Sequence, residues 1–185
     1  MTTAAFCELL QTSIPHVRAY ARSLTRNVDA ADDLVQDTLV RAWSARTQFT
    51  MGTNFKAWVF TILRNRFLDQ RRRDREVRER LDDLPDEKRV VAPSQEVVVQ
   101  FDDMARAFWR LSPHHREILM LVGANGLSYE EAAVVIGCAV GTVRSRLSRA
   151  RSELQTLLER QDDRMAPRGK RQKGAEAFLR LLKVA

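Results

Sequence analysis

Residues 127–154 read LSYEEAAVVIGCAVGTVRSRLSRARSEL, and they carry the clearest structural pattern in the C-terminal half of the chain. Ser128 and Glu131 have the spacing of a capping box, in which a hydroxyl and a carboxylate each accept a backbone N–H at a helix start. Gly137 suits the left-handed turn that ends a helix. A second apolar register follows at Val140, Val143, Leu147, Ala150 and Leu154. A short helix, a tight turn and a second helix predict a helix-turn-helix.

The outward face of the second helix predicts contact with DNA. It carries three positive charges, no negative charge and small hydroxyls, at Thr142, Arg144, Ser145, Arg146, Ser148 and Arg149. Arg side chains suit guanine edges and phosphates in the major groove, and Ser or Thr makes adaptable contacts. The alternative is an Arg-rich face that is only solvated. The joint presence of the capping box, the turn glycine and the basic face favours DNA binding.

The remaining helices follow from apolar spacing and capping residues. We expect a short first helix over Phe6–Leu10 and a second one starting at Pro15, because proline suits the first turn of a helix. Asp29 is the expected cap of the next helix. Residues 44–54 predict a loop, and residues 55–73 a long helix with Trp58 facing inward. Ser112-Pro113 marks a helix start before the helix-turn-helix.

Composition limits the class of protein. The chain has 185 residues, 44% of them hydrophobic, and 31 Lys and Arg against 24 Asp and Glu, which predicts association with polyanions. The excess of Arg over Lys fits phosphate and guanine contacts, and equally a GC-rich genome. We expect no transmembrane helix and no secretory signal. The cysteine usage, with no disulfide framework, indicates the reducing cytoplasm. Cys7 and Cys138 are too far apart in sequence for a zinc motif or disulfide framework and are expected to be buried thiols, with no cofactor or metal.

Residues 64–80 hold eight Arg against four acids, and we expect the helix to fade there. Residues 82–96 are polar and carry two prolines, which indicates a linker. The predicted fold is all-α, with a first small domain at 5–75, a flexible linker at 76–98, a second domain at 99–160 and a basic tail of unknown role at 161–185.

Three segments together resemble the bacterial extracytoplasmic-function (ECF) sigma factors, most closely their general-stress subgroup. Residues 127–154 resemble the region that reads the −35 promoter element. The segments DAADDLVQDTLVRAW (29–43) and FKAWVFTILRNRFLDQRRR (55–73) resemble the polymerase-binding helix and the −10 recognition helix. The resemblance implies a non-enzymatic subunit that binds core RNA polymerase, directs it to promoter DNA and helps open the −10 region. It also implies control by an anti-sigma factor.

The resemblance assigns roles to individual residues. The polymerase-docking set is Asp33, Gln36, Asp37 and Arg41. The −10 set, which includes ends of a loop suited to an extruded base, is Gln48, Asn54, Lys56, Thr61, Arg64, Asn65 and Arg66. The −35 set is Arg116, Ser128, Tyr129, Thr142, Arg144, Ser145, Arg146, Ser148 and Arg149.

Several residues have two possible roles. An acid near the start of this helix can either dock on polymerase or only complement the helix dipole, and Asp32 fits the second role. Phe49 and Phe55 fit either base stacking or the core. Trp43 is read as a core residue, as is Trp58, while His114 and His115 lack an acid or thiol at ligand spacing and are read as surface residues.

Two other functions compete with promoter direction. One is a sigma-like decoy that sequesters an anti-sigma factor, which need not keep a basic recognition face. The other is a stand-alone helix-turn-helix regulator, which leaves residues 5–73 unexplained. An enzyme is disfavoured because the sequence has no Gly-rich phosphate loop, metal cluster or nucleophile–base set.

Overall fold

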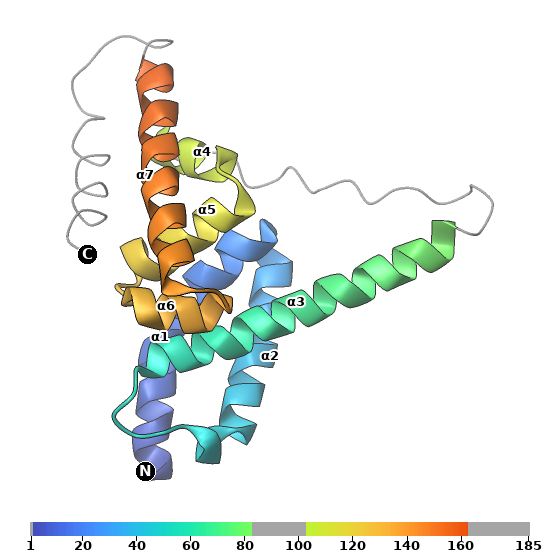
Figure 1. Ribbon diagram of the computed structural model, residues 1–185. Helices are drawn as coiled ribbons and strands as arrows, with labels where there is room; N and C mark the ends of the chain where they lie inside the picture. The colour runs from blue at the N-terminus through green and yellow to red at the C-terminus, as the bar shows by residue number, and fades with distance from the viewer. Residues whose placement is uncertain (1, 83–102, 163–185) are drawn as a thin grey trace.

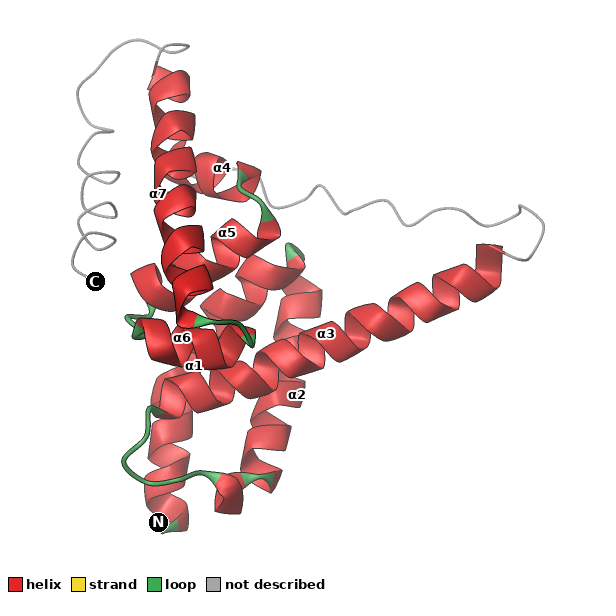
Figure 2. Cartoon of the chain, viewed as in Figure 1, coloured by secondary structure: helices red, strands yellow, loops and turns green. Residues whose placement is uncertain are grey.

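The computed structural model describes residues 2–82 and 103–162, and every regular element within these ranges is helical (Figure 2). The predicted all-α fold is confirmed. The parts of the predicted linker from residue 83 onward, and of the predicted tail from residue 163 onward, lie outside the described residues.

The first domain consists of α1 (Thr3–Thr25), α2 (Val28–Ser44), the short 3₁₀ turn η1 (Arg46–Gln48) and α3 (Phe55–Asp82). The three α-helices pack against one another around a core that is closed to solvent (Figure 1). Its largest side chains are Phe6, Tyr20, Leu34, Phe60 and Leu63.

The expectation of a helix break at Pro15 is wrong, because α1 runs through it without interruption. Phe6 lies on one side of the proline and Tyr20 on the other, and both are buried. Burial of both side chains against α2 and α3 offsets a proline penalty of about 3 kcal/mol. In the turn before Pro15, the Ser13 hydroxyl donates to the carbonyl of Leu10 at 2.7 Å.

Two other helix ends differ from the expectation. Asn27, not Asp29, caps α2, and its side-chain oxygen accepts the N–H of Ala30 at 2.9 Å. The long helix does not fade near Arg73 but continues to Asp82, and its last turns project away from the rest of the molecule (Figure 1). Arg is a good helix former, and the ion pair of Arg75 with Glu79 at 2.7 Å has the favourable i,i+4 spacing.

An aromatic cluster closes the end of the first domain where the loop between η1 and α3 passes. Phe49 and Phe55 are 9% and 8% exposed and meet edge to face, which places both in the core. Trp58 is half-buried against the same rings. Trp43 is 37% exposed, contrary to its assignment to the core, and the guanidinium of Arg46 lies 5.0 Å from its ring centre.

The second domain consists of α4 (Asp103–Arg110), α5 (Pro113–Ile118), the π-helical segment η2 (Leu119–Ala124), α6 (Tyr129–Ile136) and α7 (Val140–Asp162). The predicted helix-turn-helix is confirmed in α6 and α7. Gly137 ends α6 with a φ of 72°, a conformation that favours glycine. The predicted inward residues of α7 are buried at Val143, Leu147, Ala150 and Leu154.

The two domains pack directly on each other. Helix α6 contacts α3, while α5 and η2 contact α1 (Figure 1). The surfaces expected to handle different parts of a promoter are therefore neighbours in this structure.

Candidate nucleic-acid interface

The recognition face of α7 is presented to solvent by a well-capped helix-turn-helix. The Ser128 hydroxyl accepts the N–H of Glu131 at 3.1 Å, and the Glu131 carboxylate accepts the N–H of Ser128 at 2.8 Å. This is the predicted capping box, and it fixes the start of α6. Of the basic residues on α7, Arg144 and Arg149 are exposed and Arg146 is half-buried.

Helix α6 contributes to the same face through Tyr129. The guanidinium of Arg144 lies 5.7 Å from the centre of the half-buried Tyr129 ring, a cation–π arrangement. Hydrogen bonds from its own backbone N–H and from the Ser128 hydroxyl, with nearby Arg144, lower the pKa of the Glu130 carboxyl. The start of α6 thus places one carboxylate beside the basic face.

Arg116, assigned to the −35 set, lies elsewhere. It is 2% exposed and donates to the carbonyls of Leu111 at 2.6 Å and of Ser23, in the first domain, at 3.4 Å. Burial and the neighbouring Arg26 lower the pKa of its guanidinium to about 10. Its DNA contact stays a prediction that requires the two domains to separate.

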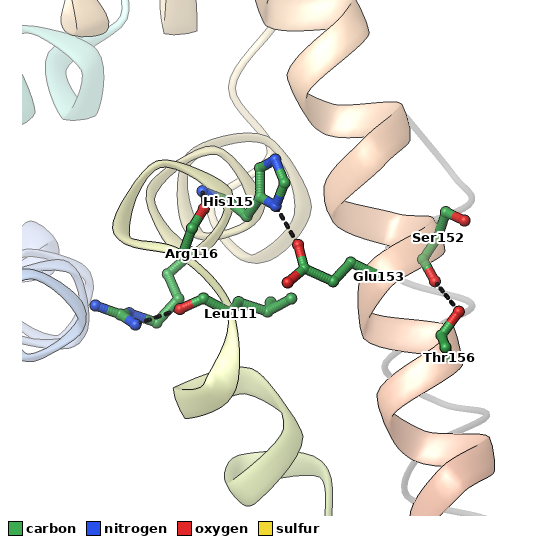
Figure 3. A network of polar contacts seen from close by, with 7 residues as sticks. Leu111, His115, Arg116, Ser152, Glu153 and Thr156 are labelled. Carbon is green, nitrogen blue, oxygen red and sulfur yellow. Dashed lines mark hydrogen bonds and ion pairs between the residues drawn. The ribbon is translucent and has the colours of Figure 1, made fainter.

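His115 differs from its assignment as an unpartnered surface residue. Its Nδ1 pairs with a carboxylate oxygen of Glu153, so it ties α5 to the middle of α7. Figure 3 shows His115 and Arg116 pointing away from α5 in different directions, one to α7 and the other toward the carbonyl of Leu111. The acid partner follows His115 by 38 positions, too far for a local spacing argument.

The polymerase-docking set lies along one exposed strip of α2. Asp33, Gln36, Asp37 and Arg41 are all exposed, at positions three and four residues apart that share a helix face. Val40 lies in the same strip and is 67% exposed, an apolar residue that the motif comparison did not single out. Its only sequence signal is its spacing of seven residues from Asp33.

The −10 set is divided among different surroundings. Gln48 and Asn65 are exposed, and Thr61 is half-buried with its hydroxyl on the Ala57 carbonyl at 2.9 Å. Asn54 caps α3, because its side-chain oxygen accepts the N–H groups of Lys56 and Ala57 at 3.0 and 3.3 Å.

Arg66, a member of the −10 set, forms an ion pair with Asp37 of the polymerase-docking set on α2. Its Nε and Nη2 both donate to Asp37 Oδ2, at 2.9 and 2.8 Å. The ion pair joins α3 to α2.

Lys56 and Arg64, two turns apart on α3, both face the second domain. Lys56 Nζ donates to the backbone carbonyl of Asn125 at 3.1 Å, and Arg64 Nε donates to Glu117 at 2.8 Å. The same Glu117 oxygen accepts the Tyr20 hydroxyl at 2.8 Å. Burial, followed by the charge and hydrogen bond of Glu117, raises the pKa of Tyr20 well above its ordinary value.

Glu117 was not identified from the sequence. It is 6% exposed and stands immediately before the buried Ile118 and Leu119. In a sequence, a charged residue next to an apolar run normally marks where the buried part of a helix gives way to its exposed part, so Glu117 gives no sign of a special role. Only the contact with α1 and α3 shows that Glu117 joins the domains.

An exposed basic face on a helix-turn-helix, in a chain that also has a three-helix first domain, is typical of a two-domain DNA-binding protein. Comparison with known proteins supplies the family. Residues 9–77 match the family described as Sigma-70 region 2, and residues 102–154 match that described as Sigma-70, region 4.

Individual relatives agree. The chain is 48% identical over 147 residues to the ECF RNA polymerase sigma factor EcfG of Rhodopseudomonas palustris (strain TIE-1), covering 79% of this chain and 81% of EcfG. It resembles the solved sigma factor RpoE in complex with the anti-sigma factor NepR from Bartonella quintana, with 47% identity, a TM-score of 0.68, and coverage of 84% and 97%. It also resembles CnrH in complex with the cytosolic domain of CnrY, with 30% identity, a TM-score of 0.61, and coverage of 87% and 92%.

The chain therefore belongs to the ECF RNA polymerase sigma factors. It is a non-enzymatic subunit that binds core RNA polymerase and directs it to promoters for transcription initiation. None of the helices within residues 2–82 and 103–162 combines the length and apolarity needed to span a bilayer.

Proposed function

We propose that this sigma factor divides promoter recognition between its two domains. The unit at 5–75 docks on core polymerase through the exposed strip of α2 and lines the melted −10 strand with α3, while the unit at 99–160 reads the −35 element with α7. The observation that carries the proposal is the basic face of α7, with Arg144 and Arg149 exposed behind a capping box that fixes α6.

Each domain offers few DNA contacts, so each has modest affinity alone. Attachment of both domains to polymerase turns the second contact into an intramolecular event and supplies the avidity. The protein alone is therefore a weak promoter binder.

The test compares promoter binding with and without core polymerase. We expect weak binding of a fluorescent promoter fragment by the free protein, and tight binding with permanganate-reactive thymines in the −10 region once core enzyme is added. A promoter with a scrambled −35 element is the matched control. Tight binding by the free protein, unchanged on addition of core enzyme, would contradict the proposal.

We propose further that the protein acts in the cytoplasm in a general stress response and is held inactive by a small anti-sigma protein. The support is the relation to RpoE, which was solved with NepR, and to CnrH, which was solved with CnrY. The exposed strip of α2, with Val40 among its charges, offers an apolar contact for an amphipathic helix. A decoy function is disfavoured, because a decoy has no use for the basic face of α7.

Co-purification from unstressed native cells, followed by hydrogen exchange, tests whether an anti-sigma protein holds the sigma factor inactive. We expect a one-to-one complex in which the backbone amides of Asp33–Arg41 and part of the second domain gain protection. Abundant free protein in unstressed cells with silent target promoters would count against it.

A further inference from the structure

The contact between the domains is centred on a buried charge cluster, here called the latch, made of Tyr20, Arg64 and Glu117. One carboxylate oxygen of Glu117 accepts both the Tyr20 hydroxyl and Arg64 Nε, each at 2.8 Å. Tyr20 is fully buried and Glu117 is 6% exposed, so the bonds are shielded from water. Charge-assisted bonds of this length in a shielded site are strong and direction-specific.

Asn125, at the end of η2, provides a second contact point. Its backbone carbonyl accepts Lys56 Nζ at 3.1 Å, and its side-chain oxygen is 3.0 Å from Nδ1 of His16. The amide nitrogen donates to the Met120 carbonyl at 2.7 Å, which orients the side chain. The two contact points involve α1 and α3 of the first domain and hold the second domain in one orientation.

These contacts occupy groups needed for DNA. Lys56 and Arg64 belong to the −10 set, and both use their charged ends on the second domain. Arg116 belongs to the −35 set, and its guanidinium donates to the Ser23 carbonyl of the first domain at 3.4 Å as well as to the Leu111 carbonyl of its own domain at 2.6 Å. The closed arrangement therefore removes cationic groups from both reading surfaces at once.

The distance along a promoter also requires the domains to part. The −10 and −35 elements lie about 25 base pairs apart by their numbering, which is roughly 85 Å at about 3.4 Å per base pair. Helix α6, which supports the −35 reader, packs directly on α3, which carries the −10 set. Two readers in direct contact cannot reach elements that far apart.

We propose that the free protein inhibits itself, with the second domain docked on the strand-lining face of the first and the latch holding them together until polymerase and promoter separate them. The inference rests on the proposed roles of α3 and α7. The second domain is the occupant of the α3 face, and promoter DNA competes with it for Lys56 and Arg64.

The surroundings of Arg116 favour opening when phosphate is available. Its guanidinium and that of Arg26 lie 5.3 and 5.7 Å from the centre of the same Trp109 ring. Among the described residues, no ion pair joins Arg116 to a carboxylate. A buried cation without a counter-charge is costly, and separation of the domains lets Arg116 meet the DNA backbone.

The first experiment compares Glu117→Gln with Glu153→Gln in the full chain. Both remove one negative charge from the second domain, but Glu153 contacts His115 within that domain. We expect Glu117→Gln to raise the radius of gyration in solution scattering. If closed molecules make up about 90% of the population, full opening raises the apparent affinity for a −10 fork DNA about tenfold. Glu153→Gln should leave both quantities at the wild-type level, and identical behaviour of the two variants would overturn the inference.

The second experiment locks the closed state. His16→Cys and Asn125→Cys, in a chain carrying Cys7→Ala and Cys138→Ala, are joined with a thiol-cleavable bismaleimide. We expect the crosslinked protein to form no open promoter complex with core polymerase, and cleavage by dithiothreitol to restore it. Single-cysteine variants capped with N-ethylmaleimide control for the adducts.

The two proposals fail in different ways. Open complexes formed equally well before and after cleavage would overturn self-inhibition and leave the proposed function intact. Absence of open complexes with the unmodified wild-type protein would overturn the proposed function. It would also overturn self-inhibition, because the closed arrangement would then have no promoter opening to inhibit.

Discussion

Charge reversal at Asp33 and Asp37 is expected to abolish binding to core RNA polymerase while leaving the protein folded. Both carboxylates are exposed on one strip of α2, whereas Leu34 and Ala42 on the other side anchor the helix in the core. Loss of one partner from a charge pair that is buried and hydrogen-bonded at an interface costs about 2–5 kcal/mol. Reversal of two such charges should cost about 4 kcal/mol or more, which is roughly a thousandfold in affinity.

The cost to folding should be small. Asp37 pairs with Arg66 at 2.8 Å, but the Asp37 side chain is 52% exposed, and a pair of this kind contributes about 1 kcal/mol or less to stability. Circular dichroism should therefore report unchanged helicity and a melting temperature lowered by a few degrees at most.

The matched control is Asp74→Lys with Glu76→Lys, on the exposed part of α3. It changes the net charge by the same amount, away from the docking strip. A pull-down with core polymerase should retain the control and lose the Asp33→Lys/Asp37→Lys variant. Equal retention of both would reject α2 as the docking surface.

Local signals explain how much of the fold was predictable. The capping box at Ser128 and the glycine at Gly137 act within a few residues, so α6 and α7 begin where the pattern placed them. The break expected at Pro15 failed for the opposite reason. Packing of Phe6 and Tyr20 in one core overrides a local preference, and that packing depends on α2 and α3.

In the candidate site, too, features set by local spacing could be predicted, whereas contacts between residues distant in sequence could not. The strip of α2 is visible in the sequence, because residues at helical spacing share a face wherever the helix is placed. The partners of His115 and of Arg64 are 38 and 53 positions away along the chain. Such contacts require the arrangement of both domains, which spacing arguments do not contain. Val40 was missed because an apolar residue in an amphipathic pattern is normally read as core.

Removal of Arg144 and Arg149 is expected to cause the second large effect, loss of −35 discrimination. Both side chains are exposed on α7 behind the buried Val143, Leu147 and Ala150. A side chain that contacts a base edge contributes about 1–3 kcal/mol, roughly 5- to 150-fold, to discrimination at that base. A side chain that contacts phosphate instead weakens binding to all sequences and lowers the salt slope by about one.

The measurement is open-complex formation by polymerase carrying Arg144→Ala/Arg149→Ala, on promoters with intact and substituted −35 elements, over a salt series. Arg22→Ala/Arg110→Ala removes the same charge from exposed positions on α1 and α4 and is the matched control. Arg146 is half-buried, so Arg146→Ala should have a smaller effect than either exposed arginine.

The salt series separates base reading from simple attraction. If Arg144 and Arg149 only attract phosphate, the double variant keeps its preference for the intact −35 element and changes slope alone. If they read bases, the preference itself collapses while binding to the substituted promoter changes little. A double variant that matches Arg22→Ala/Arg110→Ala in both preference and slope would show that α7 does not enter the groove, and the assignment of the −35 reader to this helix would be wrong.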